Sequence, residues 1–348
     1  MCCVAGLAPH GGRSAPLVSC EKGLGWSLLL SGWPVRNAVV PPELEGPIDR
    51  AVRALFEATR PSGESGHQVS WGMARAWIQT GKVRVAGELV TDATTRVRAG
   101  AQVTLDERAP RPRAARLADD MVVYFDAHVV VVAKPPGLST VPYDESETDT
   151  LDARVRGWLG RGGKGRRVVR PNLGVVHRID KETSGLVVFT RTWLAKQSLA
   201  SQFRRHTVHR RYLAIAHGDV HSRTIRSLLV ENRGDGLRGS ARGKAPPDAR
   251  EAITHVERIE SCGTATLVAC TLETGRTHQI RIHLSELGHP LVGERVYVRG
   301  WTGILVVAPR LMLHAAELGF IHPATERAVR WELPMPADMR AVLDGLRG

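Results

Sequence analysis

Apolar residues recur first at helical and then at strand spacing in the first third of the chain. In 48-IDRAVRALF-56 they fall on one face of a helix. The stretch 71–105 predicts a helix ended by glycine, a short strand, a tight turn at Ala86–Gly87, a second strand, and a last strand after Gly100. The pattern therefore predicts a small α/β unit over residues 41–106.

Two segments on either side of this unit lack a periodic pattern. Residues 1–40 mix Gly, Pro, Cys and Ser, and we expect a disordered extension there, or a translation start assigned too far upstream. Residues 107–119 are rich in Pro, Ala and Arg, which is typical of a linker.

Strand patterns dominate the rest of the chain. The segment 121-MVVYFDAHVVVVAKPPGLST-140 predicts two strands around a turn at Asp126–Ala127. Helical spacing occurs at about 192–205 and 277–287. We therefore predict an α+β domain over residues 120–340, built on a large mixed, mainly antiparallel sheet with flanking helices.

Charge favours a polyanionic partner. The chain of 348 residues has 48 Lys and Arg against 35 Asp and Glu, a formal net charge of +13. Cations near a phosphate backbone release condensed counterions, so this excess points to nucleic acid ahead of a membrane surface. The alternative is that the charge serves solubility alone.

The cysteines and the apolar runs bear on the compartment. Neither zinc-site pairing nor a dense disulfide framework is visible in the five cysteines, Cys2, Cys3, Cys20, Cys262 and Cys270. Apolar runs are too short to cross a bilayer, and no secretory signal is convincing. We expect a cytoplasmic protein with free thiols.

The stretch 177-HRIDKETSG-185 is the first candidate for chemistry. It lies between two apolar runs, Leu173–Val176 and Leu186–Phe189, which predict buried strands. Asp180 shares its turn with side chains that would keep a carboxylate ionised, namely Arg178, Lys181 and Thr183. Such a carboxylate can act as a nucleophile or a base. The alternative is a turn aspartate that caps the following segment.

A second cluster lies in 275-GRTHQIRIHLSELGHPLVGERVY-297. His278, Arg281 and Ser285 are spaced three to four residues apart, on one face if the segment is helical. This face can present a guanidinium to a carboxylate or phosphate. The alternative is a solvated basic helix.

A third candidate is the tyrosine in 209-HRRYLAIAHGDV-220. Tyr212 follows three basic residues at the start of a predicted strand, where a phenol can stack on a base. The alternative is a tyrosine of the core.

Taken together and in this order, these segments resemble the RluA-type family of RNA pseudouridine synthases. The central signature of that family is similar to 174-GVVHRIDKETSGLVVFTRT-192. Its other segments are similar to 131-VVAKPPGL-138, 194-LAKQSLASQFRRHTVHRRYLAI-215 and 312-MLHAAELGFIHPATERAVRWELPMP-336. The resemblance covers about 120–340.

The block 48–105 separately resembles the alpha-L RNA-binding domain, the module of ribosomal protein S four. The match is carried by 77-WIQTGKVRVAGELV-90, and the resemblance makes Lys82 and Arg84 candidate RNA contacts. The segment 59–75 has fewer basic residues than the module usually carries.

The resemblance implies roles for single residues. Asp180 would be the nucleophile, Tyr212 would stack on the target uracil, and Arg281 would pair with Asp180. Arg178 would fill the space left by the flipped nucleotide. Further RNA contacts would come from His177, Lys181, Thr183, Arg276 and His278. Glu294 stands where the family often has aspartate, a change that conserves charge.

A glycine-rich basic loop precedes the signature. Its cations, Arg161, Lys164, Arg166, Arg167 and Arg170, are candidates for clamping RNA near the site. The alternative is a solvated insertion. Several histidines invite a metal interpretation, but the neighbours of His177, His278 and His283 are arginines, which disfavour a divalent cation. We predict no metal.

The resulting hypothesis is a monomeric pseudouridine synthase that needs no cofactor, because the isomerisation neither adds nor removes an atom. By analogy its substrate would be large-subunit ribosomal RNA, with transfer RNA as the other choice. The alternative is a non-catalytic RNA-binding or ribosome-assembly factor on the same fold. A glycoside hydrolase would need a second acid opposite Asp180, and the motifs contain none.

Overall fold

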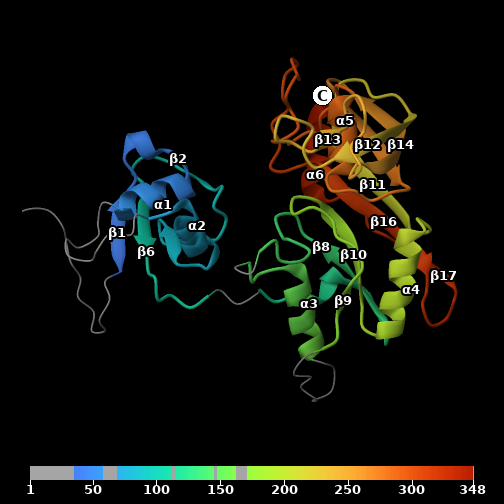
Figure 1. Ribbon diagram of the computed structural model, residues 1–348, viewed down its shortest axis with the longest axis horizontal. Helices are drawn as coiled ribbons and strands as arrows, with labels where there is room; N and C mark the ends of the chain where they lie inside the picture. The colour runs from blue at the N-terminus through green and yellow to red at the C-terminus, as the bar shows by residue number, and fades with distance from the viewer. Residues whose placement is uncertain (1–34, 58–68, 112–114, 145–146, 162–170, 348) are drawn as a thin grey trace, which may run out of the picture.

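The computed structural model describes residues 35–57, 69–111, 115–144, 147–161 and 171–347. Each of two units, a small N-terminal one and a larger C-terminal one, is organised around its own sheet (Figure 1).

The N-terminal unit packs two helices on a four-stranded antiparallel sheet of order β1-β6-β3-β4, with β2 and β5 forming a separate pair. Its elements are β1 (Arg36–Val39), η1 (Pro42–Leu44), β2 (Gly46–Pro47), α1 (Ile48–Glu57), α2 (Trp71–Gln79), β3 (Val83–Val85), β4 (Glu88–Val90), β5 (Arg96–Val97) and β6 (Gln102–Leu105). The predicted turn at Ala86–Gly87 is confirmed, because both residues have positive φ, as a two-residue hairpin requires.

The prediction that residues 1–40 form a disordered extension is wrong for Arg36–Val39. These residues form β1, which pairs with β6 in register Arg36↔Leu105 to Val39↔Gln102. Asn37 Oδ1 accepts a hydrogen bond from the Thr104 hydroxyl at 2.7 Å. A four-residue edge strand offers too short an alternation to be recognised, and its partner lies more than 60 residues away along the chain.

The C-terminal unit is built on an eleven-stranded sheet of order β13-β12-β14-β15-β11-β16-β10-β8-β7, to which β9 and β17 add at β10 and β16. Its strands are β7 (Val122–Phe125), β8 (Val129–Lys134), β9 (Gly174–Val175), β10 (Ser184–Thr190), β11 (His209–His217), β12 (Arg223–Val230), β13 (Gly239–Ser240), β14 (Arg250–Cys262), β15 (Ala265–Leu272), β16 (Leu313–Ile321) and β17 (Ala328–Glu332). The pair β10–β16 is parallel and the other described pairs are antiparallel, so the predicted sheet type is confirmed.

The helices of this unit are η2 (Asp119–Met121), α3 (Leu151–Gly160), α4 (Trp193–Arg204), α5 (Gln279–Glu286) and α6 (Ala337–Arg347). The positions predicted for α4 and α5 are confirmed, whereas α3 and α6 were not predicted. Helix α6 continues past residue 340, the predicted end of the domain, and buries Met339 and Leu343 against the sheet.

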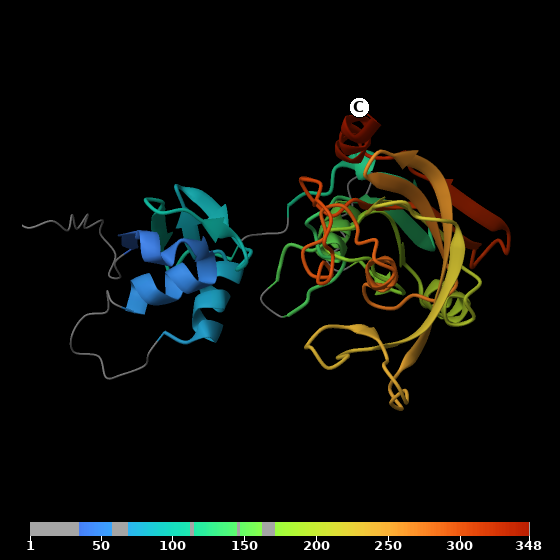
Figure 2. The ribbon, with the colours of Figure 1, turned by 90° about the horizontal axis from the view of Figure 1, so that it is seen from above.

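The sheet is strongly curved (Figure 2) and carries helices on both faces. Residues of α3 and α5 pack on one face with Val187 and Phe189, while residues of α4 pack on the other with Leu186 and Val188. This explains why β10 is an unbroken apolar run, since a strand covered on both sides has no polar face. The other predicted strand, Leu173–Val176, is reduced to the two residues of β9.

Gly185 allows the close approach of β10 and β16. Its φ is +118°, and a Cβ built there would lie 2.2 Å from the carbonyl oxygen of Ala315, its partner in the parallel ladder. We therefore expect Gly185→Ala to lower the free energy of unfolding by about 1–3 kcal/mol through strain and overpacking. Urea unfolding followed by circular dichroism measures this change.

Gly157 in α3 provides the control, because a Cβ there meets nothing within 4 Å. Gly157→Ala is expected to raise the stability by up to about 1 kcal/mol through helix propensity. Equal stability of the wild type and Gly185→Ala would contradict the argument from close packing.

None of the helices in the described part of the chain is long and apolar enough to cross a membrane.

Candidate active site

Asp180 lies in the loop that leads from β9 into β10. Its carbonyl oxygen accepts a hydrogen bond from the backbone N–H of Thr183 at 3.1 Å, which closes a tight turn directly before the strand. The carboxylate therefore lies at the start of β10, an interior strand of the sheet that is covered on both faces.

Two side chains brace this loop, Lys134 at the end of β8 and Thr140 in the segment that follows it. Lys134 is 2% exposed, and its ammonium donates to the carbonyl oxygens of Pro135, Leu138 and Lys181 at 2.7–2.9 Å. Thr140 donates its hydroxyl to the carbonyl oxygen of Ile179 at 2.9 Å. Burial lowers the pKa of Lys134 to about 7. A buried lysine thus holds the turn around Asp180 through a hydrogen bond to its backbone.

Arg281 faces this loop from α5 and is clamped by Glu294. Its Nε and Nη2 donate to the two carboxylate oxygens of Glu294 at 2.7 and 2.8 Å, in the forked geometry of a bidentate pair. Glu294 also accepts the backbone N–H groups of Arg295 and Val296 at 2.9 and 2.8 Å. Burial by itself lowers the pKa of Arg281, but the hydrogen bonds and the charge of Glu294 outweigh it and raise that pKa overall.

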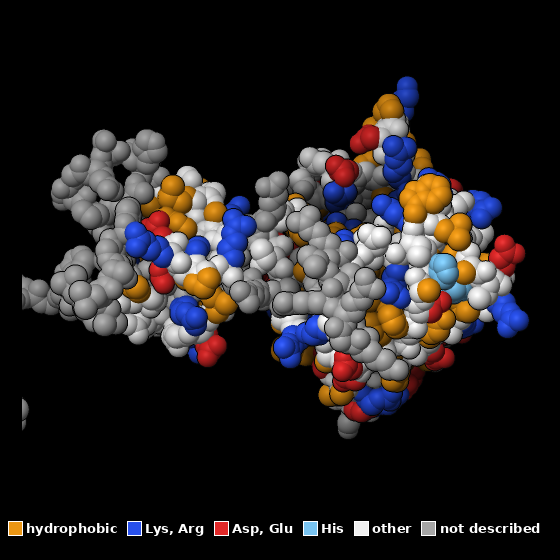
Figure 3. Space-filling view, turned by 90° about the horizontal axis from the view of Figure 1, so that it is seen from below, with side chains coloured by type: hydrophobic (Ala, Val, Ile, Leu, Met, Phe, Trp, Pro, Cys, Tyr) orange, Lys and Arg blue, Asp and Glu red, His pale blue; other side chains and the backbone are white. Residues whose placement is uncertain are grey.

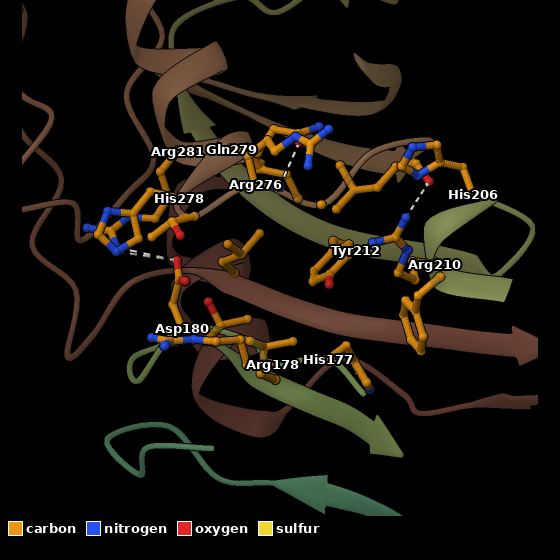
Figure 4. A pocket seen from close by; sticks show the side chains of 18 of the residues that line it. His177, Arg178, Asp180, His206, Arg210, Tyr212, Arg276, His278, Gln279 and Arg281 are labelled. Atoms are coloured by element: carbon orange, nitrogen blue, oxygen red, sulfur yellow. Dashed lines mark hydrogen bonds and ion pairs between the residues drawn. The ribbon is translucent and has the colours of Figure 1, made fainter. Parts of the chain in front are cut away.

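The third guanidinium nitrogen points at Asp180. Nη1 of Arg281 lies 3.4 Å from the Asp180 carboxylate, and Nε2 of His278 lies 3.9 Å from the same oxygen (Figure 4). The ring of His278 is held by a hydrogen bond of 2.8 Å between its Nδ1 and the Tyr297 hydroxyl. Because the fork of Arg281 is committed to Glu294, the guanidinium orients Asp180 without occupying both of its oxygens.

Asp180 and Arg281 line a cavity of about 630 Å³, and Tyr212 and Thr183 line it as well. Tyr212 comes from β11 and is 8% exposed, and burial raises the pKa of its hydroxyl. Thr183 is 1% exposed, and its hydroxyl has no hydrogen-bond partner in the described structure. A buried hydroxyl without a partner is available to a ligand.

The remaining predicted residues are placed as follows. Arg178 is exposed at the rim of the cavity, and Arg276 lines it while donating its Nε to the carbonyl oxygen of Glu251 at 2.9 Å. Lys181 is exposed and lies 3.6 Å from Glu147. His177 accepts the backbone N–H of Val188 through Nε2 at 3.0 Å, and burial lowers its pKa to about 3.

The other predicted RNA contacts lie in the N-terminal unit and in the basic loop before the signature. In the N-terminal unit Lys82 donates to the carbonyl oxygen of Ala109, and Arg84 is exposed on β3. Of the basic loop, Lys164, Arg166, Arg167 and Arg170 lie outside the described residues.

The structure corrects the alternative of a solvated basic helix. Residues 279–284 of α5 are all buried, including Arg281. Gln279 holds the start of the helix through hydrogen bonds from the Thr274 hydroxyl at 2.8 Å and to the carbonyl oxygen of Ile253 at 3.0 Å. The polar residues do lie at helical spacing, but Arg281 faces the buried carboxylate of Glu294 rather than water.

Three residues of the site were not predicted from the residue pattern. In the sequence Glu294 is distinguished only by its departure from the family pattern, and no local signal indicates that it pairs with Arg281. Lys134 carried a signal, because a lysine at the end of an apolar strand needs an acceptor. Arg210 is one of three basic residues before Tyr212, and no local signal separates it from the other two, although it lines the cavity.

The arrangement bears on the other chemistries considered. Asp180 is the one carboxylate among the described residues that line this cavity, so a pair of opposed acids is not present there. Within the described residues no group of three or more His, Cys, Asp or Glu is placed to hold a metal ion. The geometry supports one oriented carboxylate beside an aromatic ring.

Comparison with known sequences finds one matching family model and several similar proteins. The sequence model of the RNA pseudouridylate synthase family matches residues 128–286. The chain is 38% identical to ribosomal large subunit pseudouridine synthase D of Zymomonas mobilis over 272 residues, which cover 73% of this chain and 82% of that protein. It is also 38% identical over 282 residues to the uncharacterized RNA pseudouridine synthase YlyB of Bacillus subtilis, covering 78% of this chain and 88% of that protein.

Comparison with solved structures gives the same fold. The human RNA pseudouridylate synthase domain containing 4 superposes with a TM-score of 0.52 at 23% identity, over 66% of this chain and 93% of that one. The two sequence relatives are similar over most of their own length as well as over most of this chain. By these similarities the chain belongs to the RNA pseudouridine synthase family.

Proposed function

We propose that this protein isomerises uridines of large-subunit ribosomal RNA to pseudouridine, with Asp180 as the nucleophile and without a cofactor. The observation that carries the proposal is the contact of Asp180 with Arg281, whose fork is already committed to buried Glu294. The substrate is proposed from the printed name of the Zymomonas relative.

The reaction breaks the bond between sugar C1′ and uracil N1, forms a bond between C1′ and C5, and moves a proton from C5 to N1. Asp180 supplies the carboxylate, which either adds to the uracil ring or takes a proton from the sugar. Arg281 would orient that carboxylate through the contact of its Nη1 with Asp180. Tyr212 would stack on the detached uracil, and the walls of the cavity would keep it from escaping before it rejoins through C5.

Uracil within a helix is out of reach, so the target must be unpaired or flipped out, at a cost of a few kcal/mol. Arg178, exposed at the rim beside Asp180, is suited to fill the vacated space. The unpartnered hydroxyl of Thr183 is suited to hydrogen-bond the uracil or Asp180 itself.

The N-terminal unit is proposed to act as an RNA-binding module, with Lys82 and Arg84 as contacts. Its helices and the β3–β4 hairpin occur in the order that the alpha-L resemblance implies. We also propose that the protein works in the cytoplasm and acts as a monomer.

Mapping of pseudouridines tests the proposal. Total RNA from cells with and without the gene is treated with carbodiimide and read by primer extension, with complementation by wild type or Asp180→Asn. We expect one or a few large-subunit positions to vanish in the deletion strain and to return only with wild type. If no position changes in any RNA, a non-catalytic RNA-binding role replaces the proposal.

A further inference from the structure

The cavity carries more positive charge than the binding of uracil requires. One carboxylate, Asp180, lines its described part together with five arginines, Arg178, Arg204, Arg210, Arg276 and Arg281. Arg281 is balanced by Glu294, but uracil is neutral and balances none of the others. On the face shown in Figure 3, by contrast, Lys and Arg side chains are spread among acidic ones rather than gathered in one patch.

Arg210 is the most unusual of these cations. It is 7% exposed, it has no carboxylate within ion-pair distance among the described residues, and its Nε has no hydrogen-bond partner there. Nη2 donates to the carbonyl oxygen of Glu273 at 2.9 Å. Burial lowers the pKa of this guanidinium. A buried charge without an opposite charge is costly, and a bound anion would offset that cost.

The local fold holds this guanidinium at one end of the cavity. Arg210 lies two residues before Tyr212 on β11, and Figure 4 shows it across Tyr212 from Asp180. Its guanidinium carbon lies 5.6 Å from the centre of the Phe203 ring. Gly275 leaves it room, because a Cβ there would lie 2.5 Å from Nη1.

Two further arginines line the cavity, one next to Phe203 in the chain and one next to Gly275. Arg204 is the exposed last residue of α4, and Arg276 precedes α5. Neither has a carboxylate partner in the described part of the chain. The ring of His177 stacks on Phe203, with ring centres 4.7 Å apart, so an aromatic wall lies beside the cations. At about 630 Å³ the cavity has the size of sites that hold whole small-molecule ligands, so it has room for more than a base.

We infer that Arg204, Arg210 and Arg276 form a phosphodiester subsite that holds the RNA backbone next to the flipped uridine. The inference rests on the proposed function, because the phosphate belongs to the same RNA strand as the target. Guanidinium forks match the geometry of phosphate oxygens, and the phosphate supplies the charge that Arg210 lacks. The subsite explains how a pocket for a neutral base can contain several unpaired cations.

The salt dependence of kcat/KM tests the subsite. The substrate is a large-subunit ribosomal RNA transcript made in vitro, and pseudouridine formation is followed at several KCl concentrations. Each lost phosphate contact is expected to reduce the slope of log kcat/KM against log salt by about 0.7–0.9. We expect this reduction for Arg204→Gln and for Arg210→Met, whereas Arg210→Lys should retain most of the wild-type slope.

Arg205→Gln is the matched control, because Arg205 is the exposed neighbour of Arg204 and does not line the cavity. Its slope should equal that of wild type. Equal losses for Arg204→Gln and Arg205→Gln would reduce the effect to general charge and overturn the subsite. An unchanged slope for Arg204→Gln would also overturn the subsite. Because Arg204 is exposed, its substitution should not disturb the fold, so the test stays valid even if Arg210→Met is unstable.

A structural role of Arg210 gives a different result. In that case Arg210→Met lowers kcat or the urea midpoint while the salt slope stays as in wild type, and the subsite is rejected. A wild type that forms no pseudouridine in this RNA contradicts the proposed function itself, and this is seen before any variant is compared.

Discussion

Asp180→Asn is expected to lower the rate of pseudouridine formation by at least about 10³-fold while RNA affinity stays within about twofold of wild type. The amide keeps the size of the side chain and its place in the turn before β10, but it is neither a nucleophile nor a base. Arg281 remains held by Glu294, so the loss of one carboxylate should not collapse the site. Single-turnover kinetics and filter binding on the same transcript separate the two quantities.

Glu182→Gln is the control for this experiment. Glu182 is an exposed acid two residues further along the same turn and forms no ion pair in the described structure. Its substitution removes the same charge and should leave the rate close to that of wild type. Appreciable turnover by Asp180→Asn would remove Asp180 from the role of nucleophile.

Glu294→Gln is expected to lower the free energy of unfolding by about 3 kcal/mol and to reduce kcat more than it raises KM. The Glu294 side chain is fully buried. Because glutamine carries no negative charge, the substitution leaves Arg281 without its main counter-charge. The amide N–H groups of glutamine would also face the N–H groups of the guanidinium. The freed guanidinium can then pair more closely with Asp180 and weaken it as a nucleophile. Urea unfolding and single-turnover kinetics measure the two effects.

Glu294→Asp distinguishes positioning from mere stability. This variant keeps the charge and is expected to recover most of the rate lost in Glu294→Gln, although its shorter side chain must draw Arg281 or the backbone closer. If Glu294→Gln is destabilised but its kcat equals that of wild type at a temperature where it is folded, Glu294 supports the fold alone.

Much of the architecture followed from local pattern. Apolar runs such as Leu186–Phe189 are long enough to mark a buried strand, and the turn at Asp126 is marked by a residue that accepts two backbone N–H groups. Asp180, Tyr212 and Arg281 stood out because each carries reactive or polar chemistry next to a regular element. Their roles came from the resemblance of ordered segments, and they remain proposals that kinetics must test.

Other features escaped because their partners are distant along the chain. The edge strand Arg36–Val39 is recognisable only beside β6. The pattern of α5 fits a solvated helix equally well until Glu294 is seen beneath Arg281. The lack of a carboxylate near Arg210 among the described residues cannot be inferred from its neighbours in the sequence.

The sequence by itself determined the type of the large sheet, the positions of α4 and α5, the family resemblance, and the identity of the candidate residues Asp180, Tyr212 and Arg281. Only the tertiary structure decided how the charged side chains are held: Arg281 by Glu294, the turn of Asp180 by Lys134, and Arg210 without a counter-charge among the described residues. The reason is physical, because periodicity reports which face of an element is buried. The energy of a buried charge depends instead on the groups that surround it in space.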